Sequence, residues 1–410
     1  MLAEAELVIP NVLEEHYQEL QRLWLQRQGA LRSPRYVPRD LAELDERIAA
    51  HADGLVVGGQ HAAELIRAGF FAAEPEVAFA AAYPLLLTET EAAARQVWDA
   101  FFGAEGAGIW GICQALCHGP IGPALAQELQ QAVTAAAPRV ALAAAEVLCF
   151  RGLLELNVEQ TDRFLNHHDP EVRRAGWRLA RHPIWVRPTA YEAALRDPDQ
   201  GVRRLALEAA AWHRQTWLLD HCRKLASRPA PEHGDALLLL AMLGKPTDLP
   251  AILAAGQTAG LGPQRFRVLG AFGHPGVVDA LLGGMESDDP ATAAAAGAAF
   301  AKITGARVDS DTRVPVLPPD GKEPDDFERE FLDEVRLPSP ERARAFWNEA
   351  AKHFSGGTRW CRGLDLGNGL TNDALARLDL ESRWEACLRG KYEGRWQGTA
   401  ADLEKLHPLR

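Results

Sequence analysis

The sequence lacks long apolar runs, and this absence limits where the protein can work. No stretch approaches the roughly 18 uncharged apolar residues that a transmembrane helix needs. The first residues, Met1 to Glu6, lack the basic region and the long apolar core of a secretory signal. We therefore expect a cytoplasmic protein that does not enter a membrane.

Cysteine is scarce, with six residues in a chain of 410, and only Cys113, Cys117 and His118 lie close together in the sequence. A spacing of four places both thiols on one helix face. A zinc site would need a further ligand pair at a matching spacing, and the sequence has none. We predict small buried helix residues here, with no metal and no cofactor.

What the sequence does contain is a short recurring motif, which we call the recurring phrase. Asp169-Pro170-Glu171-Val172-Arg173-Arg174 returns within Asp197–Ala206, with the Asp-Pro steps 28 residues apart and the Val-Arg-Arg steps 30 apart. A period near 30 with helical patterning indicates stacked helix pairs of the HEAT type. The aspartates are predicted to cap helices, and Arg173 or Arg203 to reach an aspartate of its own or a neighbouring repeat. The recurring phrase therefore predicts Asp–Arg contacts within and between repeats, with a structural role.

Glycines that mark helix ends divide the later repeats: Gly244, Gly273 and Gly305 each close an apolar helical segment. We predict an all-α fold, a HEAT-like helical-repeat solenoid with N- and C-terminal helical caps. Its expected parts are an N-terminal helical block at 1–68, the repeat array at 69–305, a connecting segment rich in Pro and Asp at 306–336, and a C-terminal helical block at 337–410.

Sequence signatures of enzymes are missing. The chain has no His-Glu step of the kind that supplies repeated metal ligands in a HEAT-like di-iron hydroxylase, no glycine-rich phosphate loop and no nucleophile elbow. The run His167-His168-Asp169 lies in a loop before a repeat helix, where these residues are common. His51 shares a helix face with Leu44 and Ile48, which favours a packed histidine. We predict a protein without catalytic activity; a HEAT-like lyase is the less favoured alternative.

Charge is unevenly distributed along the chain, whose formal net charge is −12. Residues 1–150 hold 19 acids and 9 bases, whereas residues 151–305 hold 17 acids and 18 bases. Since phosphate binding depends on Lys and Arg, we predict no nucleic-acid partner. An acidic N-terminal part suits a basic protein partner, although charge that serves only solubility remains an alternative. The predicted contacts are Glu43, Asp45, Glu46, Asp53 and Glu64.

Both ends of the chain resemble an uncharacterised proteobacterial family of HEAT-like proteins, often encoded beside type VI secretion genes. The N-terminal likeness lies in 41–55, from Leu41-Ala42-Glu43 to Asp53-Gly54-Leu55. The C-terminal likeness lies in Leu337-Pro338-Ser339-Pro340, Phe346-Trp347, Gly356-Gly357-Thr358-Arg359-Trp360, Gly363 and Arg383-Trp384-Glu385-Ala386. Ser339 and Phe346 depart from it, because related chains have Trp there.

The resemblance implies a protein that works with a secreted antibacterial effector, and the family offers no established active site to transfer. A cytoplasmic companion of such a toxin is most often its immunity protein, which binds and neutralises it. An adaptor or assembly scaffold that loads the effector is the alternative. If the toxin, expected to be encoded nearby, is a nuclease, it would be basic and would suit the acidic N-terminal part.

Overall fold

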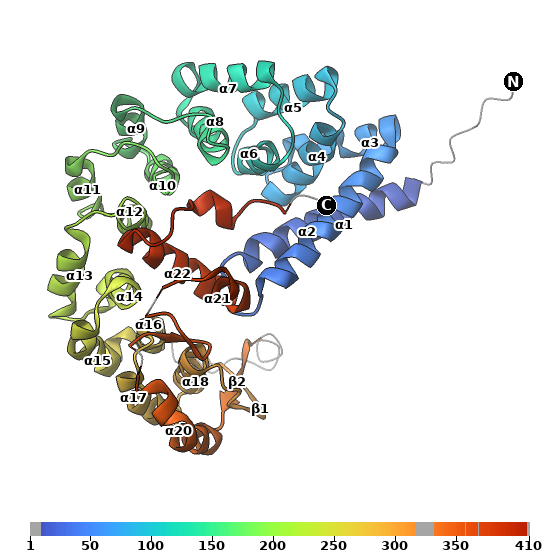
Figure 1. Cartoon of the computed structure of the whole chain (residues 1–410). Coiled ribbons are helices and arrows are strands. Elements are labelled where there is room, and N and C mark those ends of the chain that lie inside the picture. Colours follow the sequence, from blue (N-terminus) through green and yellow to red (C-terminus); the bar gives the residue numbers. More distant parts are fainter. Residues whose placement is uncertain (1–9, 317–331, 357, 368, 408–410) are drawn as a thin grey trace, which may run out of the picture. The chain divides into compact units, whose positions relative to one another are not determined.

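The computed structural model of the chain describes residues 10–316, 332–356, 358–367 and 369–407 (Figure 1). These residues are mostly helical and form two compact units. The first unit holds the described residues up to His213, together with Asp379–Glu381 and the chain from Gly398. The second holds Arg214–Leu378 and Ser382–Gln397. The predicted array at 69–305 is therefore shared between two units, and the C-terminal part contributes to both.

The first unit is built from helices joined by short turns. Proline occupies a first-turn position in α2, α4, α7, α8, α10 and α11, where its missing N–H would have no helical partner. The helices are α1 (Pro10–Ala30), α2 (Pro38–Val57), α3 (Gly59–Ile66), α4 (Pro75–Leu87), α5 (Glu91–Gly103), α6 (Gly108–His118), α7 (Pro123–Ala135), α8 (Pro138–Phe150), α9 (Val158–Leu165), α10 (Pro170–Leu179), α11 (Pro188–Ala194) and α12 (Gln200–Trp212).

Within this unit, α4, α6, α8, α10 and α12 each pack against the next, and α7, α9 and α11 each pack against the helix that follows (Figure 1). Small residues permit close packing. A Cβ atom on Gly111 of α6 would lie 1.9 Å from the carbonyl oxygen of Pro75, so α4 and α6 approach closely. Trp24 of α1 stacks on Phe79 of α4 with ring centroids 3.6 Å apart, which joins the N-terminal helices to the row.

The second unit continues with helices and adds two short antiparallel ribbons. Left-handed Gly273 and Gly305 end α16 and α18, and Gly244 ends α14, which confirms these three predicted helix ends. The elements are α13 (Leu218–Ala226), α14 (Gly234–Leu243), α15 (Leu249–Gln257), α16 (Gln264–Phe272), α17 (Val278–Gly284), α18 (Pro290–Thr304), β1 (Asp309–Pro315), β2 (Glu334–Pro338), α20 (Pro340–Phe354), β3 (Trp360–Cys361), β4 (Leu364–Asp365), α21 (Asn372–Arg377) and α22 (Leu380–Glu393).

The mostly helical structure agrees with the predicted all-α class, and the two short ribbons are its only strands among the described residues. β1 pairs with β2 in a register that places Val314 opposite Val335, and β3 pairs with β4 through Trp360 and Asp365. Within the predicted Pro- and Asp-rich connecting segment at 306–336, the described residues include β1 and the first residues of β2. Its central part, 317–331, lies outside the described residues.

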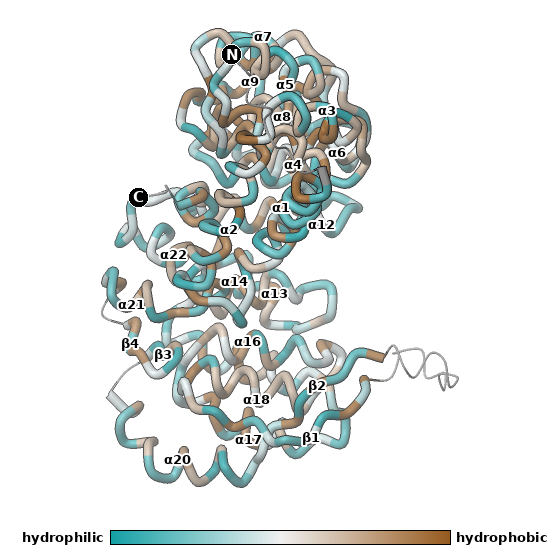
Figure 2. The backbone as a smooth tube through the Cα atoms, turned by 90° about the vertical axis from the view of Figure 1, so that its right-hand side faces the viewer, coloured by the Kyte–Doolittle hydropathy of each residue, from teal (hydrophilic) through white to brown (hydrophobic). Residues whose placement is uncertain are grey.

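Most of the helices carry both apolar and polar residues, as expected when one side of each helix is buried (Figure 2). No helix in the described part of the chain is long and apolar enough to cross a membrane.

Candidate functional site

The structure exposes four of the five acidic residues that were predicted to meet a partner. Glu43, Glu46 and Asp53 lie on α2, where spacings of three and seven place them on one side of the helix. Glu64 lies on α3 and accepts a hydrogen bond from Gln60 at 3.1 Å. Because Glu43, Glu46 and Asp53 form one exposed face, we call these three residues the acidic face of α2.

The fifth residue, Asp45, is not available to a partner, which corrects its prediction as a contact. It is only 4% exposed and pairs with the fully buried Arg27, with Nε and Oδ1 2.6 Å apart. His407, near the C-terminus, approaches the other carboxylate oxygen with Nδ1 at 2.7 Å. Burial alone would raise the pKa of Asp45, but hydrogen bonds from His407 and Arg27 outweigh it and hold the pKa below its usual value.

Arg27 also fixes the returning C-terminal segment. Its Nη2 donates to the carbonyl oxygens of Glu404 and Lys405, both at 3.0 Å. The Glu404 carboxylate pairs with Arg181 at the end of α10, at 2.7 Å. Arg181 in turn pairs with Glu146 of α8 at 2.8 Å. Buried and half-buried polar contacts thus join α1, α2, α8 and the end of α10 through the C-terminal segment.

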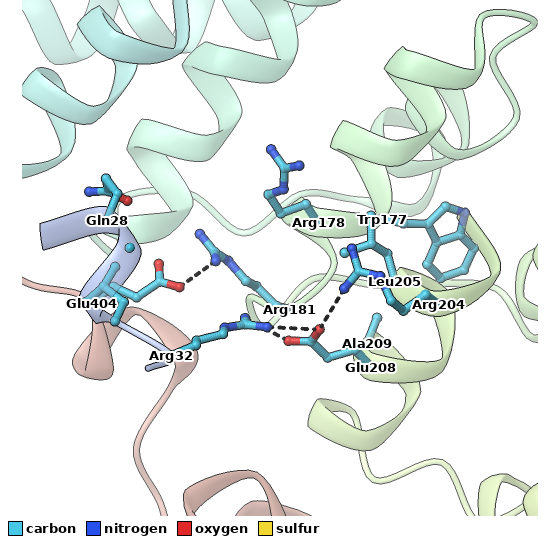
Figure 3. Close-up of a pocket in the computed structure, with 12 residues that line it drawn as sticks. Gln28, Arg32, Trp177, Arg178, Arg181, Arg204, Leu205, Glu208, Ala209 and Glu404 are labelled. Carbon is cyan, nitrogen blue, oxygen red and sulfur yellow. Dashed lines mark hydrogen bonds and ion pairs between the residues drawn. The ribbon is translucent and has the colours of Figure 1, made fainter. Parts of the chain in front are cut away.

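Two neighbouring pockets lie on the inner helices of the first unit and share Arg178. One has a volume of about 320 Å³ and is drawn in Figure 3; the other has a volume of about 540 Å³. Their charged lining is strongly basic, because it contains six arginines and three glutamates. The arginines are Arg32, Arg139, Arg174, Arg178, Arg181 and Arg204, and the glutamates are Glu171, Glu208 and Glu404. We call the six arginines the inner arginine surface.

The charges of this surface are only partly paired within the chain. Arg32 makes a two-point contact with Glu208 at 2.9 and 3.3 Å, whereas Arg204 lies 4.0 Å from the same carboxylate. The side chain of Arg178 is exposed and makes no hydrogen bond or ion pair within the described residues, and Figure 3 draws it without a partner. The arrangement therefore suits an anion.

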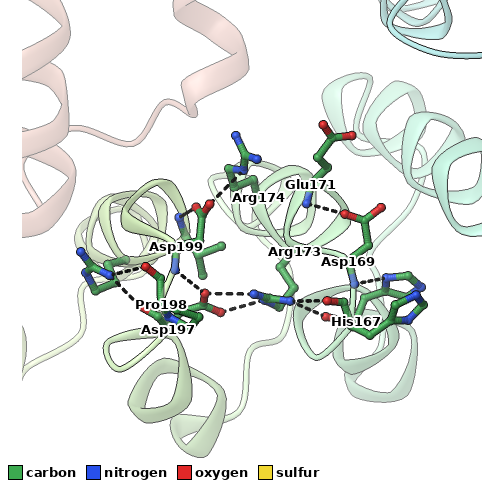
Figure 4. Close-up of polar contacts among 11 residues, drawn as sticks. His167, Asp169, Glu171, Arg173, Arg174, Asp197, Pro198 and Asp199 are labelled. Carbon is green, nitrogen blue, oxygen red and sulfur yellow. Dashed lines mark hydrogen bonds and ion pairs between the residues drawn. The ribbon is translucent and has the colours of Figure 1, made fainter.

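The recurring phrase forms the predicted aspartate–arginine contacts, shown in Figure 4. Arg173 binds the Asp197 carboxylate through two hydrogen bonds of 2.7 and 3.0 Å, and it also donates to the carbonyls of His167 and His168. Arg203 makes the matching contacts one phrase later, to the carbonyls of Asp197 and Pro198. The first arginine of each phrase is thus structural, as predicted.

The two predicted caps differ from one another. Asp169 caps α10, with its carboxylate accepting from the Glu171 N–H at 2.8 Å. Asp197 does not cap α12, because that helix begins two residues later and its cap is Asp199, which accepts from the Val202 N–H at 2.9 Å. Asp197 instead accepts from the Asp199 N–H and pairs with Arg173, so its prediction as a cap is wrong.

The second arginine of each phrase has a different position from the first. Arg174 and Arg204 occupy equivalent places on α10 and α12, and both line the inner pockets. The Nε atom of Arg174 lies 3.6 Å from Asp199, beyond hydrogen-bond distance. Sequence reasoning treated both arginines of the phrase as structural and missed this distinction. The paired arginines at a fixed offset were the signal that could have revealed it.

The histidines and cysteines considered for metal binding make local contacts. His51 is half-buried, as its helix face indicated, and its Nδ1 lies 3.0 Å from Nδ1 of His16. His167 accepts a hydrogen bond from the Asp169 N–H, and Cys113 and Cys117 are buried in α6. Among the residues that the structure describes, no three His, Cys, Asp or Glu side chains are grouped as a metal site would require.

No model of a known protein family matches this chain, and no curated protein sequence matches it. The link to secretion-associated chains stays a prediction from the motifs at the two ends of the sequence.

Proposed function

We propose that this chain is a helical-repeat protein of the HEAT type that acts by binding another protein rather than by catalysis. The recurring phrase on consecutive inner helices supports the repeat assignment, because the first arginine of each copy donates to the carbonyl six residues before it, and Arg173 also reaches Asp197 of the next copy. The observation that carries the binding proposal is the acidic face of α2. Its exposed carboxylates lie on one side of a helix, where they would attract a basic partner and set its orientation.

The proposed partner is a basic antibacterial toxin of a type VI secretion system, encoded nearby, and the proposed role is that of its cytoplasmic immunity protein. The motifs shared with secretion-associated chains support this role, and the acidic face suits a toxin that acts on nucleic acid. The toxin would be held directly, so that its activity is blocked inside the producing cell.

The test combines co-purification with charge reversal. The chain should co-purify with the product of the adjacent toxin gene, and the triple variant Glu43→Lys, Glu46→Lys, Asp53→Lys should slow association by about tenfold or more. A matched control reverses three exposed acids elsewhere in the first unit: Glu105, Glu155 and Glu192. Equal slowing in both triple variants would show that only net charge matters, and the acidic face would lose its assigned role.

A second candidate is an effector-loading adaptor, and one observation favours it. An adaptor must contact both its cargo and the secretion machinery, and the first unit carries two surfaces of opposite charge. Deleting the gene in cells that carry the active neighbouring toxin separates the two roles. Loss of an immunity protein poisons the producing cells, whereas loss of an adaptor leaves them healthy and unable to export the toxin.

A further inference from the structure

The inner arginine surface is a row of like charges on successive helices. Arg139 lies on α8, Arg174 and Arg178 on α10, and Arg204 on α12. Arg174 and Arg178 are one helical turn apart and therefore share a helix face. Holding these guanidinium groups together costs free energy unless an anion offsets the repulsion between their positive charges. The three glutamates that line the pockets are too few to neutralise the six arginines.

The arginines that are still free to bind an anion lie at the centre of this row of arginines. Arg139 already pairs with Glu171 at 2.5 Å, and Arg181 with Glu404. Arg178, which lines both pockets, has no partner among the described residues, while Arg174 and Arg204 are held only at 3.6 and 4.0 Å from a carboxylate. An anion placed between α10 and α12 would thus gain short contacts without breaking any that exist.

We propose that the inner arginine surface is a docking site for an extended acidic polypeptide segment. Neighbouring packed helices are about 10 Å apart, and an extended chain advances about 3.3 Å per residue. A segment of about six residues would then reach from Arg139 to Arg204, with a carboxylate near each helix it crosses. Half-buried Trp110, which lines the larger pocket, offers an apolar wall for the backbone or an apolar side chain of that segment.

This site is separate from the acidic face of α2, so it serves an additional partner and does not depend on the toxin. A partner with acidic residues in an extended tail or loop has the matching chemistry. A single small oxyanion would fill one pocket only, whereas the row of arginines continues across both.

The test uses the full chain and a fluorescein-labelled hexaglutamate peptide, followed by fluorescence anisotropy. The wild-type protein should bind the peptide, and binding should weaken as salt rises. The double variant Arg178→Gln, Arg204→Gln should lose at least about tenfold in affinity with an unchanged melting temperature. The matched control is Arg196→Gln with Arg228→Gln, two exposed arginines outside both pockets, which should bind like the wild type.

The proposal would be overturned by no peptide binding at low salt or by an equal loss of affinity in the control variant. Full competition by inorganic pyrophosphate, at concentrations below those at which unlabelled peptide competes, would overturn it as well. Tighter binding of a thymidine hexanucleotide than of hexaglutamate would also overturn it, because the surface would then be a phosphate-binding site. None of these results depends on the neighbouring toxin, so this test and the co-purification test fail independently.

Discussion

At the scale of single residues, the two copies of the recurring phrase show how similar sequences come to hold different roles. Asp169 and Asp197 both precede proline, yet Asp169 caps its helix and Asp197 pairs with the arginine of the preceding phrase. The difference arises because the second copy has three residues between Pro and Val, Asp199 to Gly201, where the first copy has only Glu171, and this moves the helix start by two residues. The two aspartates should therefore differ in their contribution to stability.

We predict that Asp197→Ala destabilises the first unit more than Asp169→Ala. The Asp169 variant loses one cap, at a cost of about 1 kcal/mol. The Asp197 variant loses a two-point ion pair whose side chains are 15% and 10% exposed, and a cost of about 2 kcal/mol is expected. Urea unfolding of the two variants measures the difference. If the Asp169 variant is as unstable as the Asp197 variant, the Arg173–Asp197 ion pair does not contribute more to the free energy of unfolding than the Asp169 cap does.

At the scale of elements, local sequence predicted the helices well and their distant contacts poorly. Helix ends at Gly244, Gly273 and Gly305 follow from residues that are close in the chain. The burial of Asp45 could not be predicted, because its partners include His407, which is 362 residues away. The inner arginine surface was missed for the same reason, since α8, α10, α12 and the turns that follow α1 and α10 supply it together.

The docking of the C-terminal segment onto the first unit should weaken in acid. The N–H of Leu406 donates to Nδ1 of His118 at 3.3 Å, which requires a neutral acceptor nitrogen. Burial, followed by the charge of Arg27, holds the pKa of His118 well below its ordinary value. A lowered folded-state pKa means that this stability is present above the unfolded pKa, about 6.5, and is lost as the pH falls below it.

We therefore expect the urea midpoint of the wild type to fall between pH 7 and pH 5. The variant His118→Asn keeps an acceptor oxygen that does not titrate, so its midpoint should depend less on pH. His61→Asn, at an exposed position, is the matched control and should keep the wild-type dependence. An unchanged pH dependence in His118→Asn would remove His118 as the cause.

At the scale of the whole molecule, each unit has its own buried arginine that joins distant segments. Arg27 joins α1 and α2 to the C-terminal segment in the first unit. In the second unit, Arg359 is 9% exposed and donates to the carbonyls of Ala241, Met242 and Gly244 at the end of α14, and of Ala271 in α16. These carbonyls lie at or near helix ends, where the helix itself has no N–H group left to donate to them.

We expect the two units to unfold as separate calorimetric transitions, because each has its own core and its own internal packing. Arg359→Met leaves several buried carbonyls without a donor, at a cost of about 3 kcal/mol, and should lower one transition by roughly 6 to 12 °C. Asp197→Ala should lower the other transition, by a smaller amount. A single transition that both variants lower would show instead that the units unfold together, so that a substitution in either unit destabilises the entire chain.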